Sequence, residues 1–404
     1  MSFKKESLRL HRENKGKLTV KAKMPVMDFN DLSLVYSPGV AEPCKEIYEN
    51  PEDIYNYTMK GNTVAVVTDG SAVLGLGDIG PSAALPVMEG KAVLFKQFAE
   101  VDAFPICVQR GTIDEFVETV KRLEPTFGGI NLEDISAPHC FVIEERLKKE
   151  MEIPVFHDDQ HGTAIVTAAG LINALKVTEK SLDEIKVVIS GVGAAGIAVT
   201  KLLLNLGVQH MIVCDRKGAI YEGRTVGMNP FKEKIAKRTN LKRKRGSLKD
   251  NIKNADVFIG VSAPGILTPD MVRTMAENPI IFAMANPVPE IMPEEAKRAG
   301  ALVIGTGRSD LPNQVNNVLA FPGVFKGALS VLASEINEHM KLAAVYAIAN
   351  IIKSHELNAD YVIPDPFDPR VVFSVASAVA QSAIETGVAR KKDREQLINQ
   401  GSYI

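Results

Sequence analysis

The chain has 404 residues, of which 46% are hydrophobic and 24% are charged, and its formal net charge is −2. This length allows two domains with a sizeable core, and the near-neutral charge argues against nucleic acid or an anionic membrane as the main partner. The 4 cysteines form no CxxC pair, so neither a disulfide framework nor a zinc site is expected.

No run reaches the roughly 18 apolar residues of a membrane span, and no apolar segment follows the Lys-rich N-terminus as in a secretory signal. The basic run at 242–245 has no aromatic stacking partners in the neighbouring sequence and fits a solvated loop. We therefore expect a cytoplasmic protein without nucleic-acid or membrane partners.

From Thr63 onward, short β-branched runs alternate with segments of helical period. The expected strands are 64–67, 106–108, 186–189, 211–214, 257–259, 280–282 and 302–304. They are continuously apolar, which is typical of parallel strands covered on both faces. The predicted fold class is therefore α/β with two domains. We expect a first domain at 1–153, a second at 154–385 and a C-terminal tail at 386–404; helices from about Ala328 would close the second domain or pack back on the first.

The pattern GxGxxG occurs twice, at 75–80 and at 191–196. The second copy follows an apolar run and precedes a helical pattern that stops at Gly207, and the next predicted strand ends in Asp215. That order predicts a Rossmann-type dinucleotide site. The first copy runs directly into Pro81 and has no acid at the end of the next strand, so we expect it to shape a substrate cleft or a subunit contact. The residues predicted to bind NAD or NADP are Gly191, Gly193, Ala194, Ala195, Gly196, Asp215 and Arg216.

Asp215 favours NAD slightly, because a carboxylate there repels the 2′-phosphate of NADP. Arg216 and Lys217 follow it directly, and either could accept that phosphate. Both cofactors therefore stay open.

Two apolar runs, 130–132 and 155–156, each lead into adjacent acids. The carboxyl ends of strands face the ligand crevice in open α/β sheets, and carboxylates gathered there repel one another unless a cation lies among them. Oxygen ligands without cysteine select Mg²⁺ or Mn²⁺. The alternative is that these acids are solvated or cap a helix. The candidates are Glu133, Asp134, Asp158 and Asp159.

Together, segments spread over nearly the whole chain resemble malic enzyme, the metal-dependent enzyme that oxidatively decarboxylates malate to pyruvate and CO₂. They are 36–41, 68–70, 75–80, 90–91, 133–134, 157–163, 191–196, 285–287, 316–317 and 321–323. The length is similar to that of the short bacterial and archaeal form. The resemblance implies an N-terminal substrate domain, a Rossmann domain, NAD(P) and a homodimer.

The resemblance also implies roles for single residues. The base would be Lys91 with Asp158 as its partner, and Tyr36 would protonate the enol product. Burial would lower the pKa of Lys91 and the charge of Asp158 would raise it, and the sequence leaves that balance open. The metal ligands would be Glu133, Asp134 and Asp159. Asn286 and Asn317 would donate to a substrate carboxylate, and Asn286 would also bind the cofactor.

Taken singly, these side chains also have ordinary explanations, such as a surface lysine or asparagines in turns. One departure matters: longer family members carry a substrate-binding arginine where this chain has Ala72. Which residue binds the C1 carboxylate of malate is therefore not indicated.

Two competing hypotheses are an amino-acid dehydrogenase of similar two-domain build and a dinucleotide-binding protein without turnover. Amino-acid oxidation needs no metal and leaves the paired acids unexplained. A binding protein would not need the lysine and tyrosine at matched positions.

Overall fold

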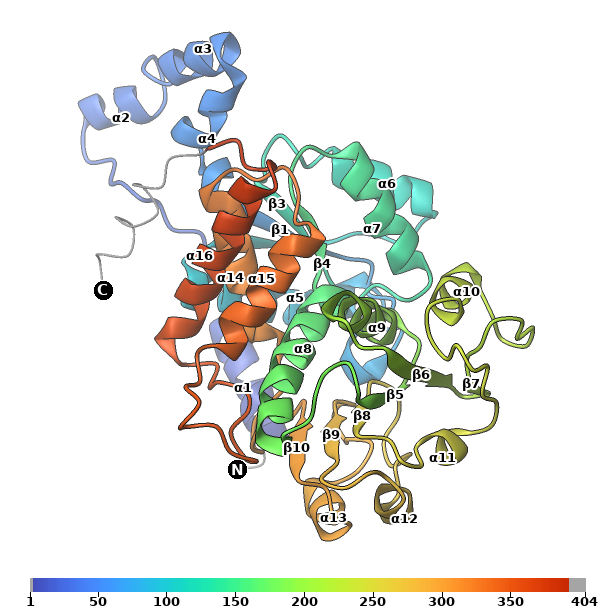
Figure 1. Ribbon diagram of the computed structural model, residues 1–404. Coiled ribbons are helices and arrows are strands. Elements are labelled where there is room, and N and C mark those ends of the chain that lie inside the picture. Colours follow the sequence, from blue (N-terminus) through green and yellow to red (C-terminus); the bar gives the residue numbers. More distant parts are fainter. Residues whose placement is uncertain (1–2, 392–404) are drawn as a thin grey trace.

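The computed structural model describes residues 3–391, and within them the strands form two sheets flanked by helices (Figure 1). No helix among these residues is long and apolar enough to cross a membrane. The chain therefore has the predicted α/β class, with one sheet in each half.

The first sheet has the strand order β2-β1-β3-β4 and is parallel throughout. Its strands are β1 (Thr63–Thr68), β2 (Asp102–Cys107), β3 (Gly129–Leu132) and β4 (Val155–His157), and its helices are α5 (Pro81–Ala99), α6 (Ile113–Lys121) and α7 (His139–Glu150). The strand expected at 106–108 begins earlier, at Asp102. Its Pro105 is tolerated because β2 lies at the edge of the sheet.

The second sheet has the order β10-β9-β8-β5-β6-β7, and only β7 runs antiparallel to its neighbour. Its strands are β5 (Lys186–Ser190), β6 (His210–Asp215), β7 (Gly218–Ala219), β8 (Val257–Gly260), β9 (Ile280–Ala283) and β10 (Val303–Thr306). Its helices are α9 (Ala194–Leu206), α10 (Pro230–Ala236), α11 (Leu248–Asn251), α12 (Pro269–Arg273) and α13 (Pro293–Arg298). β6 lies on one side of β5 and β8 lies on its other side, so the strand order reverses at β5. A doubly wound sheet binds its ligand in the crevice at such a reversal, here between β5 and β8.

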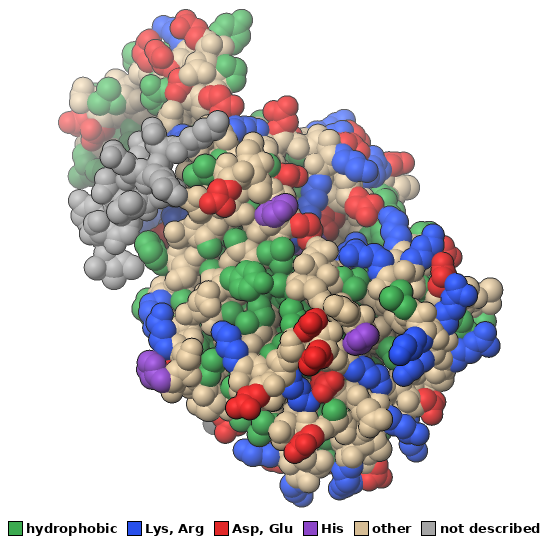
Figure 2. Space-filling view, viewed as in Figure 1, with side chains coloured by type: hydrophobic (Ala, Val, Ile, Leu, Met, Phe, Trp, Pro, Cys, Tyr) green, Lys and Arg blue, Asp and Glu red, His purple; other side chains and the backbone are tan. Residues whose placement is uncertain are grey.

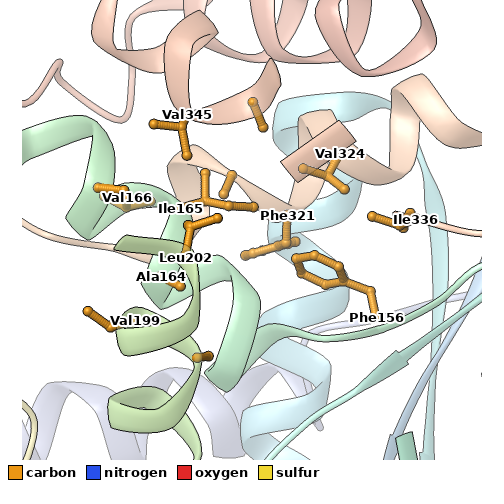
Figure 3. Close-up of a cluster of buried hydrophobic side chains, with 14 of the residues drawn as sticks. Phe156, Ala164, Ile165, Val166, Val199, Leu202, Phe321, Val324, Ile336 and Val345 are labelled. Carbon is orange, nitrogen blue, oxygen red and sulfur yellow. The ribbon is translucent and has the colours of Figure 1, made fainter. Parts of the chain in front are cut away.

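The long helix α8 (Asp158–Thr178) joins the two sheets and packs against α9 and α15. Figure 3 shows its side chains Ile165 and Val166 among Phe321 and Val345 from the C-terminal helices. Those helices are α14 (Phe321–Ser330), α15 (Glu338–Ala349) and α16 (Pro369–Glu385). Because α14 and α16 also contact α5, the C-terminal helices pack back on the first half of the chain.

The predicted domain boundary at 153/154 stays a prediction. Just beyond it, β4 pairs with β3 and extends the first sheet, so the second sheet begins only after α8. Of the predicted tail at 386–404, residues 392–404 lie outside the described residues.

The N-terminal segment carries α1 (Phe3–Asn14), α2 (Phe29–Val35), α3 (Ala41–Glu49) and α4 (Ile54–Tyr57). Residues 29–53, here called the arm, project from the rest of the molecule (Figure 1). Neither α2 nor α3 buries a residue, and Phe29 and Tyr48 are 88% and 89% exposed. Figure 2 shows hydrophobic side chains on its surface. The arm is thus an apolar surface that the rest of residues 3–391 leaves uncovered.

Candidate active site and dinucleotide crevice

Charged side chains from α5, β3 and α8 meet at the carboxyl end of the first sheet. Glu133 and Asp134 follow β3, while Asp158 and Asp159 begin α8 directly after β4. The parallel register pairs Leu132 with His157, so the acids after both strands lie side by side. Lys91 reaches them from α5. These five ionisable residues, Lys91, Glu133, Asp134, Asp158 and Asp159, are called the Lys91 cluster below.

Lys91 is held between two carboxylates. Its Nζ lies 2.6 Å from Asp158 Oδ2 and 2.9 Å from Glu133 Oε1, and its side chain is only 8% exposed. The ammonium also lies 4.3 Å from the ring centroid of Phe321. Burial lowers the pKa of Lys91, but the charges of Asp158 and Glu133 outweigh it and leave the pKa above its usual value. The balance that the sequence left open therefore favours the charged lysine in the absence of a bound cation.

Three of the acids could hold a metal ion. Glu133, Asp134 and Asp159 each offer a carboxylate oxygen, and these oxygens all lie within 4.8 Å of one another. Asp159 Oδ2 accepts from the backbone N–H of Asp134 at 2.7 Å. The buried Asp134 Oδ2 has no hydrogen-bond partner. A buried polar atom without a hydrogen-bond partner needs an explanation, and a bound cation would supply one. Three converging carboxylates are the oxygen ligands that a hard divalent cation prefers.

The acids of the Lys91 cluster repel one another. Burial raises the pKa of Asp134 to about 8, and the charges of Asp159 and Glu133 add to the rise. Burial likewise raises the pKa values of Glu133, Asp158 and Asp159, against the opposing pull of Lys91. A single ammonium therefore does not compensate these carboxylates, and the cluster retains an excess of negative charge.

Neighbouring polar groups fix the acids in place. The buried amide of Asn131 donates to Glu133 Oε2 at 2.9 Å, and Asn317 donates to Asp158 Oδ2. Gly162 is required one turn along α8, because a Cβ there would collide with Asp158 Oδ1. Asn131 is not predicted from the sequence, because its place in an apolar strand two residues before Glu133 is its only local signal.

The two histidines beside the acids have different surroundings. His157 is fully buried, and neither ring nitrogen has a hydrogen-bond partner. His161 points away from the acids: its Nε2 lies 2.6 Å from Glu144 Oε1 and its Nδ1 lies 3.3 Å from Lys341 Nζ. Since burial lowers the pKa of His161 to about 3, the neutral ring donates to Glu144 and accepts from Lys341.

The residues expected near the substrate are only partly brought together. Asn317 touches Asp158 and so belongs beside the Lys91 cluster. Asn286 lies against the first glycine motif, where its carbonyl oxygen lies 2.7 Å from the position of a Cβ built on Gly75. The first glycine motif thus meets the loop after β9. Tyr36 is not in the cluster, because it is 70% exposed on the arm (Figure 1).

The second glycine motif lines a cavity of about 890 Å³ at the carboxyl ends of β5 and β8. Gly191 and Gly193 lie in its wall, and α9 begins at Ala194. Gly191 has a φ of +116°, and a Cβ there would collide with the carbonyl of Val261; a Cβ on Gly196 would collide with Gly191. The glycines therefore let strand, loop and helix approach closely, as a pyrophosphate site requires.

Asp215 lies at the rim of this cavity but does not act alone. Arg224 Nη2 donates to its two carboxylate oxygens at 2.7 and 3.0 Å, and Lys232 Nζ donates to Oδ2 at 2.7 Å. Burial would raise the pKa of Asp215, but these two cations lower it. We call Asp215, Arg224 and Lys232 the Asp215 cluster. Its net charge is positive, so Arg224 and Lys232 offset the repulsion that Asp215 would exert on a 2′-phosphate, and the slight preference for NAD stays a prediction.

Arg216, which is predicted to bind the cofactor, also lines the cavity. Arg224 and Lys232 were missed, because they follow Asp215 by 9 and 17 residues and no motif links them. Only the tertiary fold brings them to the carboxylate.

Known proteins were compared with this chain. The family model described as malic enzyme, N-terminal domain, matches residues 15–148, and the model described as malic enzyme, NAD binding domain, matches residues 160–384. The bifunctional malic/malolactic enzyme of Bacillus subtilis is 68% identical over 96% of this chain and 95% of its own length. The NAD-dependent malic enzyme of Geobacillus stearothermophilus is 59% identical over 93% of this chain and 78% of its own length.

Among solved structures, the NAD-dependent malic enzyme of Thermotoga maritima has a TM-score of 0.90 and 52% identity, covering 93% of this chain and 98% of that one. The family models, the sequence identities and the fold all indicate the same family. The chain belongs to the malic enzyme family.

Proposed function

We propose that this protein oxidises malate and decarboxylates it to pyruvate and CO₂, with NAD or NADP as the hydride acceptor. The observation that carries the proposal is the Lys91 cluster: a buried lysine and an excess of carboxylates meet at the carboxyl end of the first sheet, in a chain whose second sheet carries a dinucleotide cavity. Family membership and the malic enzymes among its relatives support the same reaction.

Glu133, Asp134 and Asp159 fit a divalent cation, and we infer that they hold Mg²⁺ or Mn²⁺. Support comes from their converging oxygens, from the unpartnered Asp134 Oδ2 and from the absence of sulfur among the donors. When bound, the ion supplies a Lewis acid for the substrate's hydroxyl or keto oxygen. The nicotinamide supplies the hydride acceptor.

Lys91 takes the proton from the C2 hydroxyl of malate in this proposal. It must first lose its own proton, and the ion pairs with Asp158 and Glu133 oppose that loss. Lys91 therefore becomes a competent base only when the charge of these carboxylates is compensated. Asp158 keeps the lysine aligned, and Asn317 keeps Asp158 aligned through its amide donor. Loss of CO₂ from C4 then leaves an enol that needs a proton at C3.

Asn286 and Asn317 would donate hydrogen bonds to a substrate carboxylate. Support comes from their contacts: Asn317 donates to Asp158, and Asn286 lies against the Gly75 loop. Two amides on separate elements can fix the orientation of a small dicarboxylate. Asn286 would also lie near the nicotinamide end of the cofactor.

We further propose a homodimer in which Tyr36 supplies the C3 proton to the active site of the second copy. Support comes from the arm, whose apolar side chains the described residues 3–391 leave exposed, and from the exposure of Tyr36 itself. An exposed apolar surface of this kind marks an interaction site. A two-fold dimer would bury both arms equivalently.

A mixing experiment tests the dimer. Tyr36→Phe and Lys91→Ala variants, each nearly inactive alone, are unfolded together and refolded so that their subunits exchange. If Tyr36 acts in the other subunit, each heterodimer has one site with both residues intact, and the mixture recovers about a quarter of wild-type activity. If Tyr36 acts within its own chain, no intact site forms and the mixture stays inactive.

The reaction itself is tested by steady-state assays of malate with NAD and with NADP, each with and without Mn²⁺. Metal-dependent formation of reduced cofactor and pyruvate in equal amounts is expected. Cofactor binding without any turnover would refute the proposed function.

A further inference from the structure

The Lys91 cluster lacks positive charge for its proposed substrate. Malate brings two carboxylates, whereas Lys91 already faces the carboxylates of Glu133 and Asp158 and has two more acids nearby. Even with a divalent cation among the acids, the four carboxylates outweigh the cation and Lys91, so no positive charge is left for the second carboxylate of the substrate. A guanidinium is the side chain best suited to supply it, because it binds a carboxylate through two parallel hydrogen bonds.

The loop after β10 begins and ends at residues of the proposed substrate site. It starts at Gly307, where a Cβ would lie 2.8 Å from the side-chain amide of Asn286. It ends at Asn317, which donates to Asp158. A residue at either end of this loop is therefore close to the space between Asn286 and the Lys91 cluster.

Arg308 directly follows Gly307 in this loop. Its Nε donates to Asp310 Oδ1 at 2.8 Å and its Nη2 donates to Oδ2 at 2.6 Å, so a carboxylate already binds both nitrogens. The backbone N–H of Arg308 donates to Thr306 Oγ1 at 3.2 Å and fixes the turn. Asp310 is 62% exposed, and exposed ion pairs contribute little to stability. A substrate carboxylate can therefore replace Asp310 on Arg308 at small cost.

We propose that Arg308 binds one carboxylate of malate, and that Asp310 occupies the same two nitrogens when no substrate is bound. The proposal rests on the proposed function and adds a residue that determines substrate specificity. Arg110 is the other arginine near the glycine loop, but it joins two separate segments through Asp78 and the carbonyl of Gly70. The contacts of Arg110 therefore hold two segments together, whereas those of Arg308 reach only an aspartate two residues further along the same turn.

The first test is Arg308→Ala. KM for malate should rise about 10- to 100-fold, because a charged bidentate contact is lost, while Mn²⁺ affinity and KM for NAD(P) stay unchanged. Arg308→Lys keeps the charge but loses the planar pair of donors, so its KM for malate should lie between those of the wild type and Arg308→Ala. Arg370→Ala is the matched control, since Arg370 also donates from Nε and Nη2 to the two oxygens of an aspartate two residues away, Asp368, but at the start of α16. Asp310→Asn should lower KM for malate severalfold, because the internal competitor loses its charge.

The second test compares two inhibitors that differ by one carboxylate, tartronate and glycolate. The wild type should bind tartronate more tightly, and Arg308→Ala should lose most of that difference. An unchanged ratio of the two inhibition constants would overturn the proposal. A rise in KM for malate with Arg110→Ala and none with Arg308→Ala would assign the carboxylate to Arg110 instead. Failure of the proposed function would look different: the wild type itself would not turn over malate. A failure of the Arg308 proposal alone would leave wild-type turnover intact.

Discussion

The Lys91 cluster and the Asp215 cluster differ in the sign of their excess charge. At the first, Lys91 meets an excess of carboxylates, and the pKa of Asp134 rises to about 8. At the second, one carboxylate meets both Arg224 and Lys232, and the pKa of Asp215 falls. The same residue type therefore has its pKa shifted in opposite directions, because its neighbours differ.

The sign of the excess charge at each cluster indicates the charge of the ligand that the cluster would bind. A buried excess of negative charge is costly until a cation binds, which suits Glu133, Asp134 and Asp159 to a metal. A positive excess at the rim of the dinucleotide cavity suits Arg224 and Lys232 to an anion such as the 2′-phosphate of NADP. The following predictions test this contrast, beginning with the largest expected effect.

Lys91→Ala removes the only cation of the Lys91 cluster. We expect kcat to fall by roughly 10²- to 10⁴-fold, the usual range for loss of a general base. KM for malate should change much less, and ammonium or methylamine should partly restore the rate by entering the vacated space. Steady-state kinetics with and without added amine measure this; a rise in KM alone would make Lys91 a binding residue.

Glu133→Gln, Asp134→Asn and Asp159→Asn each remove one negative charge with little change in volume. Mn²⁺ affinity should fall by more than about 100-fold, because even loss of an outer partner of a metal ligand costs 10- to 100-fold. Malate oxidation and decarboxylation of added oxaloacetate should fall together, while NAD(P) binding persists. Titration with Mn²⁺ measures the affinity, and a variant that keeps full affinity is excluded from the metal site.

The sequence indicates most members of the Lys91 cluster, but of the Asp215 cluster it indicates only Asp215 itself. Glu133, Asp134, Asp158 and Asp159 follow two apolar runs, and parallel strands bring such ends together. Both runs became β3 and β4 in register. The glycines after β5 were equally predictable, since their local geometry requires them.

The remaining parts depend on contacts that no local pattern encodes. Arg224 and Lys232 approach Asp215 from a loop and from α10. Tyr36 matches a family motif, yet its position on the arm is fixed by tertiary structure. The pKa of Lys91 could not be predicted either, because it depends on two short ion pairs competing with burial.

Lys232→Ala tests the positive excess of the Asp215 cluster. We expect kcat/KM with NADP to fall about 10-fold, the value of one hydrogen bond to a charged group, and kcat/KM with NAD to change little. Lys234→Ala is the control on the same helix, because Lys234 lies over the Phe231 ring and not on Asp215. Asp215→Ala should shift the ratio the other way, toward NADP. Equal losses with both cofactors in Lys232→Ala would show that Lys232 only supports Asp215.

The smallest effect concerns the stability of the metal-free protein. The pKa of Asp134 is about 8 in the folded chain, above the value of about 4 in the unfolded one. Its protonation therefore stabilises the fold fully below about pH 4, and that contribution is lost as the pH rises through about 8. Glu133, Asp158 and Asp159 shift in the same direction. Tm measured with a chelator should thus fall by a few degrees between about pH 6 and 8.

Adding Mn²⁺ at pH 8 should reverse this loss, because a bound cation compensates the ionised acids. Asp134→Asn should flatten the pH dependence without metal, since one repelling charge is gone. Asp183→Asn serves as the control, because Asp183 caps a turn through Ser181 far along the chain from the Lys91 cluster. A Tm that rises from pH 6 to 8 without metal would contradict the excess of negative charge, and with it the contrast between the two clusters.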